Sequence, residues 1–289
     1  MKTLKQLPRS RLYRIIRKGE VRINKKRSKP DYRLQAGDLV RIPPVEGADP
    51  ATQVKTISAE QVERLERRIL FENASLLVID KPCGLAVHSG SNLSYGAIDI
   101  VRRMRPREPI ELAHRLDRDT SGCLVFAKNR PALLEFQRLM QLNALRKAYH
   151  ALVMGTWPEQ KVEVDRPLQR QHMPNGERRV FVDAAGQSAL TRFRIINTFN
   201  RDGIDYSLLQ AELVTGRTHQ IRVHCQAEGH PIAGDQKYGQ REFNRAMRRL
   251  GCRRLMLHAH HLEIPANAHS PKLELNAPEP TIFRELTNR

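Results

Sequence analysis

The spacing of apolar residues along the chain changes between two periods, and each period predicts a different element. Apolar residues three and four apart predict helices, as at Leu12, Ile15 and Ile16, whereas alternating or continuous apolar runs predict strands. Strands are expected at residues 21–24, 39–42, 69–71, 76–79, 123–127, 149–154, 190–196 and 206–214. They interleave with helices without regular βαβ spacing, so the sequence predicts an α+β fold with a largely antiparallel mixed central sheet.

Residues that begin and end helices support four helical segments. The first lies between Ser10, a suitable N-cap, and Gly19, a suitable C-cap. A charged helix is expected around residues 60–68. A third begins at Pro131 and is expected to bury Leu133, Leu134, Phe136, Leu139 and Met140. The fourth is expected to be capped by Thr218 and to run through Glu228.

The charge of the chain indicates a polyanionic partner. The 289 residues include 50 Lys and Arg against 31 Asp and Glu, a formal net charge of +19. Residues 1–50 hold fourteen of these basic residues and only five acidic ones. Nucleic acid is the simplest partner for such an excess, and a generally basic surface that only favours solubility is the alternative.

The same composition argues against a membrane or secreted protein. No run approaches the roughly 18 apolar residues of a membrane span, and the N-terminus has no apolar signal core. The four cysteines are far apart and form no Cys-x-x-Cys pair. We therefore expect a cytoplasmic protein with reduced thiols and neither a zinc knuckle nor a disulfide framework.

The densest group of reactive side chains lies at residues 114–122, His-Arg-Leu-Asp-Arg-Asp-Thr-Ser-Gly, directly before the apolar strand 123–127. Catalytic groups are often carried on loops at the ends of strands. Asp117 lies between two arginines, and nearby positive charge favours the ionised form of a carboxylate, which can act as a nucleophile or general base. A salt-bridged surface turn is the alternative interpretation of these nine residues.

This segment resembles the HRLD-x-x-TSG signature of the RluA-type RNA pseudouridine synthases. Further segments in the same order resemble other motifs of that family, at residues 78–88, 147–149, 215–224, 229–232 and 257–259. The resemblance runs from about residue 69 to the C-terminus. It implies the family fold, a mixed central sheet with the active cleft across it.

The resemblance also implies the activity, which is isomerisation of uridine to pseudouridine in RNA with no cofactor and no metal. It assigns Asp117 as the catalytic aspartate, Arg222 as its paired arginine and Tyr149 as the active-site tyrosine. Arg115 corresponds to the arginine that fills the space left by the flipped base. Asp119 falls at a variable position of the motif. A monomer is expected.

The first 45 residues resemble an S4 RNA-binding module, through a basic helix followed by the segments VRIN, GD and VRIP. The helix that usually opens such a module has no counterpart here, so we expect an S4-like module without its first helix. We predict this module at 1–45, a linker at 46–66 and the catalytic domain at 67–289. The residues predicted to contact RNA phosphates are Arg9, Arg14, Arg17, Lys18, Lys25 and Lys26 in the module and Arg217 in the catalytic domain.

The S4-like module favours large-subunit (23S) ribosomal RNA, or the assembling large subunit, as the partner. The same activity on transfer RNA is one alternative, and a non-catalytic S4-type RNA-binding or ribosome assembly factor is another. A nuclease or deaminase would need metal ligands or an acid and base pair that the sequence does not offer. His258, His260 and His261 lack partnering Cys or acidic residues at ligand spacing, so core packing or RNA contact is expected of them.

Overall fold

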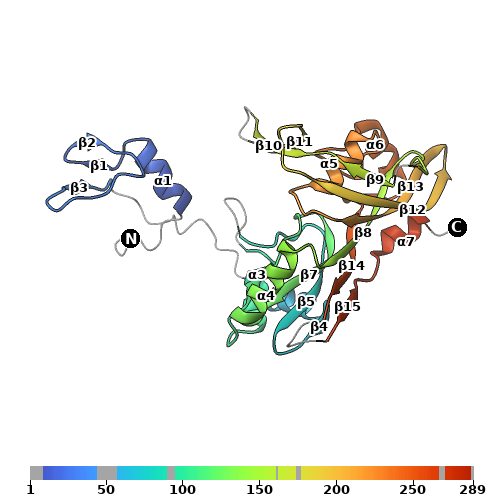
Figure 1. Ribbon diagram of the computed structural model, residues 1–289, viewed down its shortest axis with the longest axis horizontal. Coiled ribbons are helices and arrows are strands. Elements are labelled where there is room, and N and C mark those ends of the chain that lie inside the picture. The colour runs from blue at the N-terminus through green and yellow to red at the C-terminus, as the bar shows by residue number, and fades with distance from the viewer. Residues whose placement is uncertain are drawn as a thin grey trace. The chain divides into compact units, whose positions relative to one another are not determined.

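The chain consists of two units, which are described separately (Figure 1). The computed structural model describes residues 9–43, 57–89, 95–160, 162–173, 177–266 and 271–287. One unit is Met1–Thr56 and the other is Ile57–Arg289. None of the helices in the described part of the chain has the length and apolar character needed to cross a bilayer.

The N-terminal unit is a short helix followed by a small antiparallel sheet. It consists of α1 (Arg9–Arg17) and the strands β1 (Arg22–Ile23), β2 (Lys26–Arg27) and β3 (Val40–Arg41), in the order β2-β1-β3. Asn24 and Lys25 turn the β1–β2 hairpin with φ angles of 48° and 65°, the positive values that a type I′ turn requires. Asn24 Nδ2 also donates to Asp38 Oδ1 at 2.7 Å, which ties this turn to the segment before β3. The residues that would hold a preceding helix lie outside the described part.

The second unit is built on one large sheet. Its strands are β4 (Ile69–Glu72), β5 (Leu76–Lys81), β6 (Glu111–Leu112), β7 (Ser121–Ala127), β8 (Arg146–Met154), β9 (Glu163–Asp165), β12 (Leu190–Arg201), β13 (Ile204–Leu213), β14 (Leu257–Ile264) and β15 (Leu273–Asn276). A separate hairpin is formed by β10 (Leu168–His172) and β11 (Arg178–Val182). The helices are α2 (Ala59–Glu66), α3 (Ala97–Met104), α4 (Arg130–Gln141), α5 (Gln220–Ala227), α6 (Arg241–Arg249) and α7 (Thr281–Thr287).

The large sheet has ten strands, and its main path runs β4-β5-β7-β14-β8-β13-β12-β9. The pair β7 and β14 is parallel, and the other strand pairs described in this sheet are antiparallel. The predicted α+β fold with a largely antiparallel mixed sheet is therefore confirmed. Strand β7, which follows the candidate catalytic loop, lies inside the sheet, and all seven of its residues are buried.

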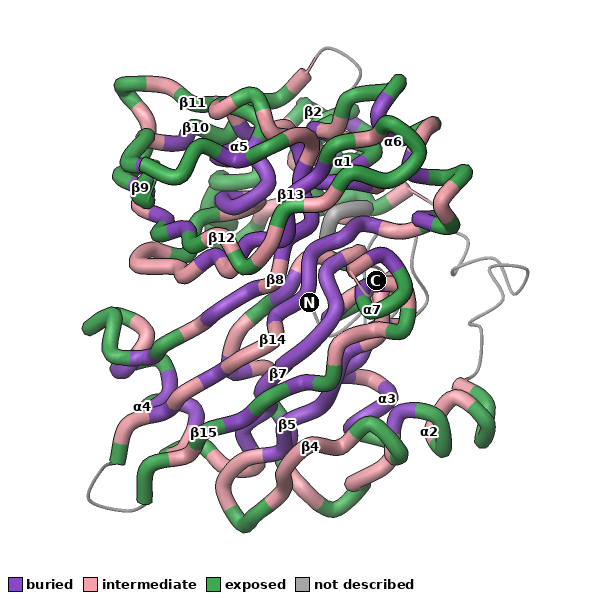
Figure 2. Tube along the Cα trace, turned by 90° about the vertical axis from the view of Figure 1, so that its right-hand side faces the viewer, coloured by how far each residue is buried: buried purple, intermediate pink, exposed green. Residues whose placement is uncertain are grey.

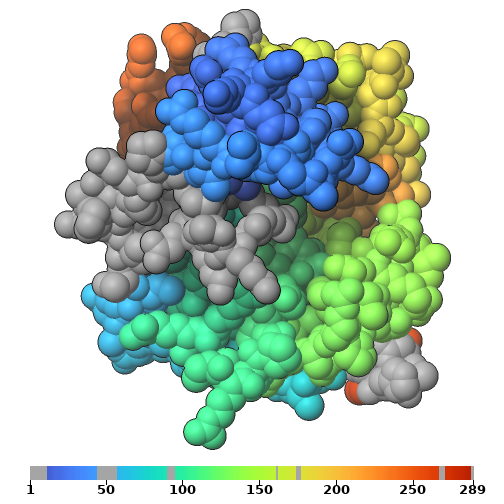
Figure 3. All heavy atoms as spheres, turned by 90° about the vertical axis from the view of Figure 1, so that its left-hand side faces the viewer, coloured from blue at the N-terminus to red at the C-terminus, as the bar shows by residue number. Residues whose placement is uncertain are grey.

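Helices pack on both faces of the sheet at β5 and β7, because alternate residues of a strand point to opposite faces. On one face Leu77 and Leu124 join the core that includes Val101 of α3. On the other, Val78 and Val125 join the core that includes Leu133, Phe136 and Leu139 of α4. Figure 2 shows the buried strands between these helices, and both helices reach the surface in Figure 3, α3 in green and α4 in yellow-green. The middle of β7 is thus packed on both faces.

Most of the predicted segments correspond to observed elements, and three details were wrong. Ser10 was expected to cap the first helix, but α1 already begins at Arg9, so Ser10 lies inside it. Leu134 was expected on the buried side of α4, but it is 49% exposed. Thr218 was expected to cap α5, but the N-cap is His219, in the left-handed region at φ 58° and without a side-chain capping bond. The Thr218 hydroxyl instead accepts a hydrogen bond from Arg170 of β10.

Gly122 allows the close approach of β7 to β14. Its φ of +108° is unfavourable for residues with a side chain. A Cβ atom there would lie 2.2 Å from the carbonyl oxygen of Ala259 on β14. The turn glycine of the candidate loop is therefore required both by its backbone angle and by the parallel neighbour strand.

Candidate active site

The candidate catalytic loop lies between β6 and β7 and is closed by a short turn. The backbone N–H of Thr120 donates to the carbonyl of Asp117 at 3.2 Å. Leu116 and Thr120 are buried on either side of Asp117, whose side chain is 19% exposed. The loop therefore presents one partly accessible carboxylate from an otherwise anchored turn.

Lys81, the last residue of β5, holds the loop through a hydrogen bond to its backbone. Its ammonium group is completely buried and donates three hydrogen bonds to backbone carbonyls, those of Pro82 at 3.0 Å, Leu85 at 2.9 Å and Arg118 at 2.9 Å. Arg118 directly follows Asp117. Burial disfavours the charged form and lowers the pKa of Lys81 to about 8. The three carbonyl oxygens compensate part of the cost of burying the ammonium group.

Asp117 forms an ion pair with Arg222 of α5, as the sequence predicts. Arg222 Nη1 donates to Asp117 Oδ2 at 3.0 Å, while Nε and Nη2 of the same guanidinium donate to the two oxygens of Asp235 at 2.8 Å each. Burial opposes the charge of Arg222, but these two carboxylates outweigh it and raise the pKa of the guanidinium. One arginine thus serves two carboxylates, of which Asp235 is buried and Asp117 partly accessible.

His219, the N-cap of α5, also faces Asp117. The Tyr238 hydroxyl accepts the backbone N–H of Val180 at 3.0 Å, and so its own proton is free for His219 Nδ1, 2.7 Å away. Burial lowers the pKa of His219 to about 4, so the ring is neutral at pH 7. This hydrogen-bond arrangement assigns the ring proton to Nε2, which lies 3.7 Å from Asp117 Oδ2.

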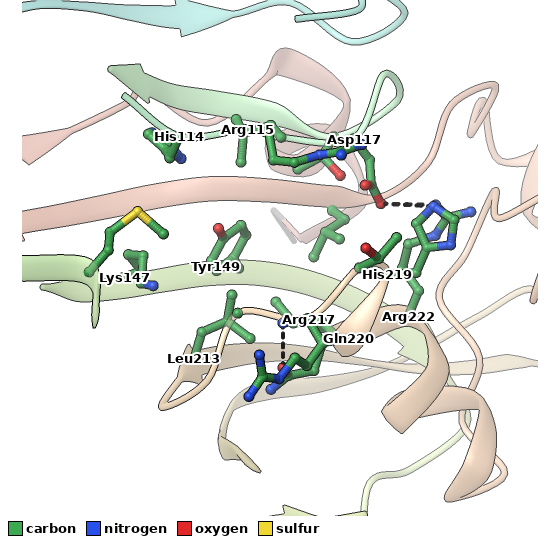
Figure 4. Close-up of a pocket in the computed structure, with 17 residues that line it drawn as sticks. His114, Arg115, Asp117, Lys147, Tyr149, Leu213, Arg217, His219, Gln220 and Arg222 are labelled. Atoms are coloured by element: carbon green, nitrogen blue, oxygen red, sulfur yellow. Dashed lines mark hydrogen bonds and ion pairs between the residues drawn. The ribbon is translucent and has the colours of Figure 1, made fainter. Parts of the chain in front are cut away.

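A pocket of about 290 Å³ opens beside Asp117 (Figure 4). It brings together five residues that the sequence singled out, namely Arg115, Asp117, Tyr149, Arg217 and Arg222. Its opposite wall is formed by β8, where the side chains of Lys147 and Tyr149 are two residues apart and share a face.

The aromatic and basic groups of this pocket differ in accessibility. Tyr149 is only 7% exposed, and burial, followed by the charge of Asp117, raises the pKa of its hydroxyl, which therefore stays protonated. Arg115 is exposed at the rim. Arg217 Nε donates to the Ser188 carbonyl at 3.0 Å, which leaves the rest of its guanidinium available. Burial lowers the pKa of Lys147.

Asp117 also borders a second pocket, of about 580 Å³. The residues of this second pocket beyond the loop and α5 include Gln236 and Lys237, which follow Asp235, and Arg253 and Arg254, which precede β14. Arg115, Asp117, His219 and Arg222 belong to both pockets. The carboxylate therefore lies on the border between an aromatic pocket and a basic one.

The basic residues predicted in the S4-like module lie on the N-terminal unit. Arg14, Arg17, Lys18, Lys25 and Lys26 are all exposed there. Arg9 begins α1, and its side chain lies outside the described part. These residues form a basic surface of their own unit.

The described residues hold no group of His, Cys, Asp or Glu side chains that could bind a metal ion. The three histidines near the C-terminus are occupied by protein groups instead. His258 bonds with the Ser121 hydroxyl at 2.8 Å, His260 with the Ala277 carbonyl at 3.0 Å and His261 with Asn276 at 2.8 Å. His258 thereby contacts the start of β7, while His260 and His261 contact the end of β15 and the residue that follows it.

Sequence reasoning missed two residues that complete this site, Asp235 and Tyr238. Both contact residues of α5, but they lie on the loop that follows it, and no periodicity or spacing links them to Asp117. The available signal was the pattern Gly234-Asp235 followed by Tyr238 and Gly239, a polar turn after the buried segment 231–233. Only the fold reveals which side chains this turn faces.

Comparisons with known proteins agree with this geometry. Residues 75–227 match the family described as RNA pseudouridylate synthase, and residues 2–40 match the S4 domain. Two similar curated proteins are named ribosomal large subunit pseudouridine synthase C. The one from Pasteurella multocida is 46% identical over 277 residues, which cover 95% of this chain and 83% of that protein. The one from Escherichia coli is 44% identical over 278 residues, covering 95% and 86%.

Two solved structures are also similar. Human RNA Pseudouridylate Synthase Domain Containing 1 superposes with a TM-score of 0.63 at 27% identity, over 76% of this chain and 85% of that one. Human RNA Pseudouridylate Synthase Domain Containing 4 gives a TM-score of 0.62 at 26% identity, over 81% and 95%. The similarity therefore extends from the sequence to the arrangement of the sheet.

Proposed function

This chain belongs to the RNA pseudouridylate synthase family, and from that premise we propose that it isomerises uridine to pseudouridine in large-subunit ribosomal RNA, with Asp117 as the catalytic carboxylate. The names of the similar proteins from Pasteurella multocida and Escherichia coli support this RNA target. The observation that carries the proposal for the site is the ion pair of Asp117 and Arg222 at the border of the pocket.

The reaction conserves all atoms of the nucleotide. The bond from N1 of uracil to C1′ breaks, the base turns, a bond forms from C5 to C1′, and the C5 proton is lost while N1 gains one. A carboxylate can begin this sequence by attack at C1′, by attack at C6 or by removing the C2′ proton, and each route needs the charged form. Arg222 compensates that charge while it leaves Asp117 Oδ1 without a hydrogen-bond partner among the described residues.

Tyr149 and Arg115 fit two further steps. The tyrosine ring forms a flat wall on which the uracil can stack, and its protonated hydroxyl can donate a hydrogen bond to the base. A uridine inside folded RNA must leave its stack to reach Asp117. The exposed guanidinium of Arg115, two residues before the carboxylate, can occupy the vacated position by stacking and hydrogen bonding.

The same proposal includes a cytoplasmic monomer whose S4 domain binds the RNA. Ribosomal RNA is a cytoplasmic substrate in cells without a nucleus, and the basic residues of the N-terminal unit are suited to bind phosphates. The described residues of the catalytic unit supply both walls of the pocket, so a second copy is not needed to complete it.

Substitution of Asp117 by Asn tests the proposal. With a transcript of large-subunit ribosomal RNA labelled with tritium at uridine C5, wild-type protein should release tritium, and Asp117→Asn should reduce the rate by on the order of 10³-fold or more, as removal of a nucleophile does. RNA affinity should stay within a few fold, because the amide keeps the shape of the side chain.

Asp119→Asn is the matched control, since Asp119 belongs to the same loop but borders only the second pocket, where it pairs with Arg118 at the surface. It should keep near wild-type activity. A wild-type rate in Asp117→Asn would remove Asp117 from the mechanism. Release of tritium from a transfer RNA transcript but not from the ribosomal transcript would retain the activity and overturn the proposed target.

A further inference from the structure

Helix α6 presents a row of arginines to solvent. Arg241, Arg245 and Arg249 are four residues apart and therefore lie along one side of the helix, about 6 Å apart along its axis. All three are exposed, while Phe243, Asn244 and Met247 anchor the other side of the helix in the protein. We refer to Arg241, Arg245 and Arg249 as the arginine stripe.

The stripe is not neutralised by acidic neighbours. Within the described part of the chain, none of its three guanidiniums forms an ion pair, and Glu242, the acidic residue of α6, pairs with none of them. Other surface helices behave differently, since Arg67 pairs with Glu63 at the end of α2 and Arg138 pairs with Glu135 on α4. Three uncompensated charges on one side of a helix repel one another, so an anion bound there would relieve this repulsion.

The stripe belongs to a segment of the chain whose two ends line the second pocket. The segment before α6 contributes Gln236 and Lys237 to that pocket, and the segment after it contributes Arg253 and Arg254. Between them, Arg248 Nη2 donates to Gln236 Oε1 at 3.3 Å, which links the helix to the pocket wall. The stripe therefore lies between two segments of the chain that both line the second pocket.

We propose that the arginine stripe binds phosphates of the substrate RNA outside the target nucleotide, on the part of the strand that continues from the second pocket. This rests on the proposed function. Guanidinium groups bind phosphate oxygens through paired N–H donors, and such contacts position a nucleic acid without reading its sequence. The stripe should therefore matter for RNA that extends beyond the modified loop, and not for the chemical step.

Simultaneous substitution of the three arginines by glutamine tests this proposal. The control is Arg103, Arg107 and Arg130→Gln, which removes the same charge from three exposed arginines that are not part of either pocket. Affinity for the large-subunit transcript is measured from low to moderate salt. The stripe variant should lose roughly 0.7–0.9 from the slope of log K against log salt for each phosphate contact removed, so about two to three for all three arginines, whereas the control should lose much less.

Turnover separates binding from chemistry. On the long transcript the stripe variant should show a raised KM and a kcat within about twofold of wild type. On a short stem-loop that contains only the modified region it should match the control. Arg241, Arg245 and Arg249→Lys, which keeps the charges, should restore most of the salt slope.

Equal salt slopes and equal KM values for the stripe variant and the control would overturn the proposal. An equal loss on the short stem-loop would also overturn it, because the stripe would then act within the pocket. Failure of the proposed function is distinguishable, since wild-type protein would then release no tritium from the ribosomal transcript whatever the salt slopes are. Circular dichroism melting of each variant shows whether α6 remains folded.

Discussion

Arg222 divides its donors between two carboxylates, and this division determines how each one is used. Asp235 receives two hydrogen bonds from the guanidinium and two more from the backbone N–H groups of Lys237 and Tyr238. Asp117 receives one. The buried carboxylate is therefore saturated and holds the arginine in place, while the accessible one keeps an oxygen free.

We predict that Asp235→Asn lowers kcat by roughly 10- to 100-fold, by analogy with the loss of a group that orients a ligand. The amide donates where the carboxylate accepted, so it cannot hold the guanidinium in the same position. Removal of one partner of a buried pair also destabilises the fold, by about 3 kcal/mol. Tritium release at saturating RNA measures kcat, and urea unfolding measures stability.

Asp183→Asn is a suitable comparison, because Asp183 lies in an exposed turn where its Oδ1 accepts the N–H of Ala185. It should change neither quantity by much. Wild-type kcat in Asp235→Asn would mean that Arg222 needs no second carboxylate to hold Asp117.

At this scale the sequence predicted the residues of the motifs and the pairing of Asp117 with Arg222, but not the residues outside the motifs that hold them. Asp117, Tyr149 and Arg222 were singled out through a resemblance, and they line one pocket. Asp235 and Tyr238 were missed, because a hydrogen bond between side chains on separate segments depends on the packing of those segments.

The sequence predicts the strand β7 itself, but it does not predict which strands lie beside β7 in the sheet. Its continuous apolar run predicts a buried strand, and every residue of it is buried. Its pairing with β14, more than 130 residues later in the chain, leaves no local pattern, and this pair is the parallel one. Likewise, no local pattern shows that α3 packs on one face of the sheet and α4 on the other.

We predict that Gly122→Ala destabilises the catalytic unit by at least about 2–3 kcal/mol, because the added Cβ meets both an unfavourable φ angle and the Ala259 carbonyl. The urea midpoint should fall, and activity should fall with it, since Asp117 lies on the loop that enters β7.

Gly203→Ala is the matched comparison at the β12–β13 turn. Its φ is +73°, but no atom lies within 4 Å of the added Cβ. It should therefore cost only about 1 kcal/mol. Equal losses at the two glycines would show that the angle alone, and not the approach of β14, limits residue 122.

The whole molecule separates a basic binding unit from a catalytic unit that has its own core. We predict that deletion of residues 1–45, which removes fourteen Lys and Arg, weakens RNA binding by about tenfold or more and leaves kcat within about twofold. The measurements are RNA affinity at moderate salt and tritium release at saturating RNA. Unchanged affinity would mean that the catalytic unit alone anchors the RNA.

The position of Asp117 on the border of two pockets has a consequence for substrate choice. A free uridine nucleotide can fill the aromatic pocket, but it has no neighbouring nucleotides to occupy the basic one. The binding energy that holds the sugar against the carboxylate would then be only partly available, and productive alignment would be rare. Under the proposed function, polymer length therefore acts as a filter, and we expect free uridine nucleotides to be converted far more slowly than RNA.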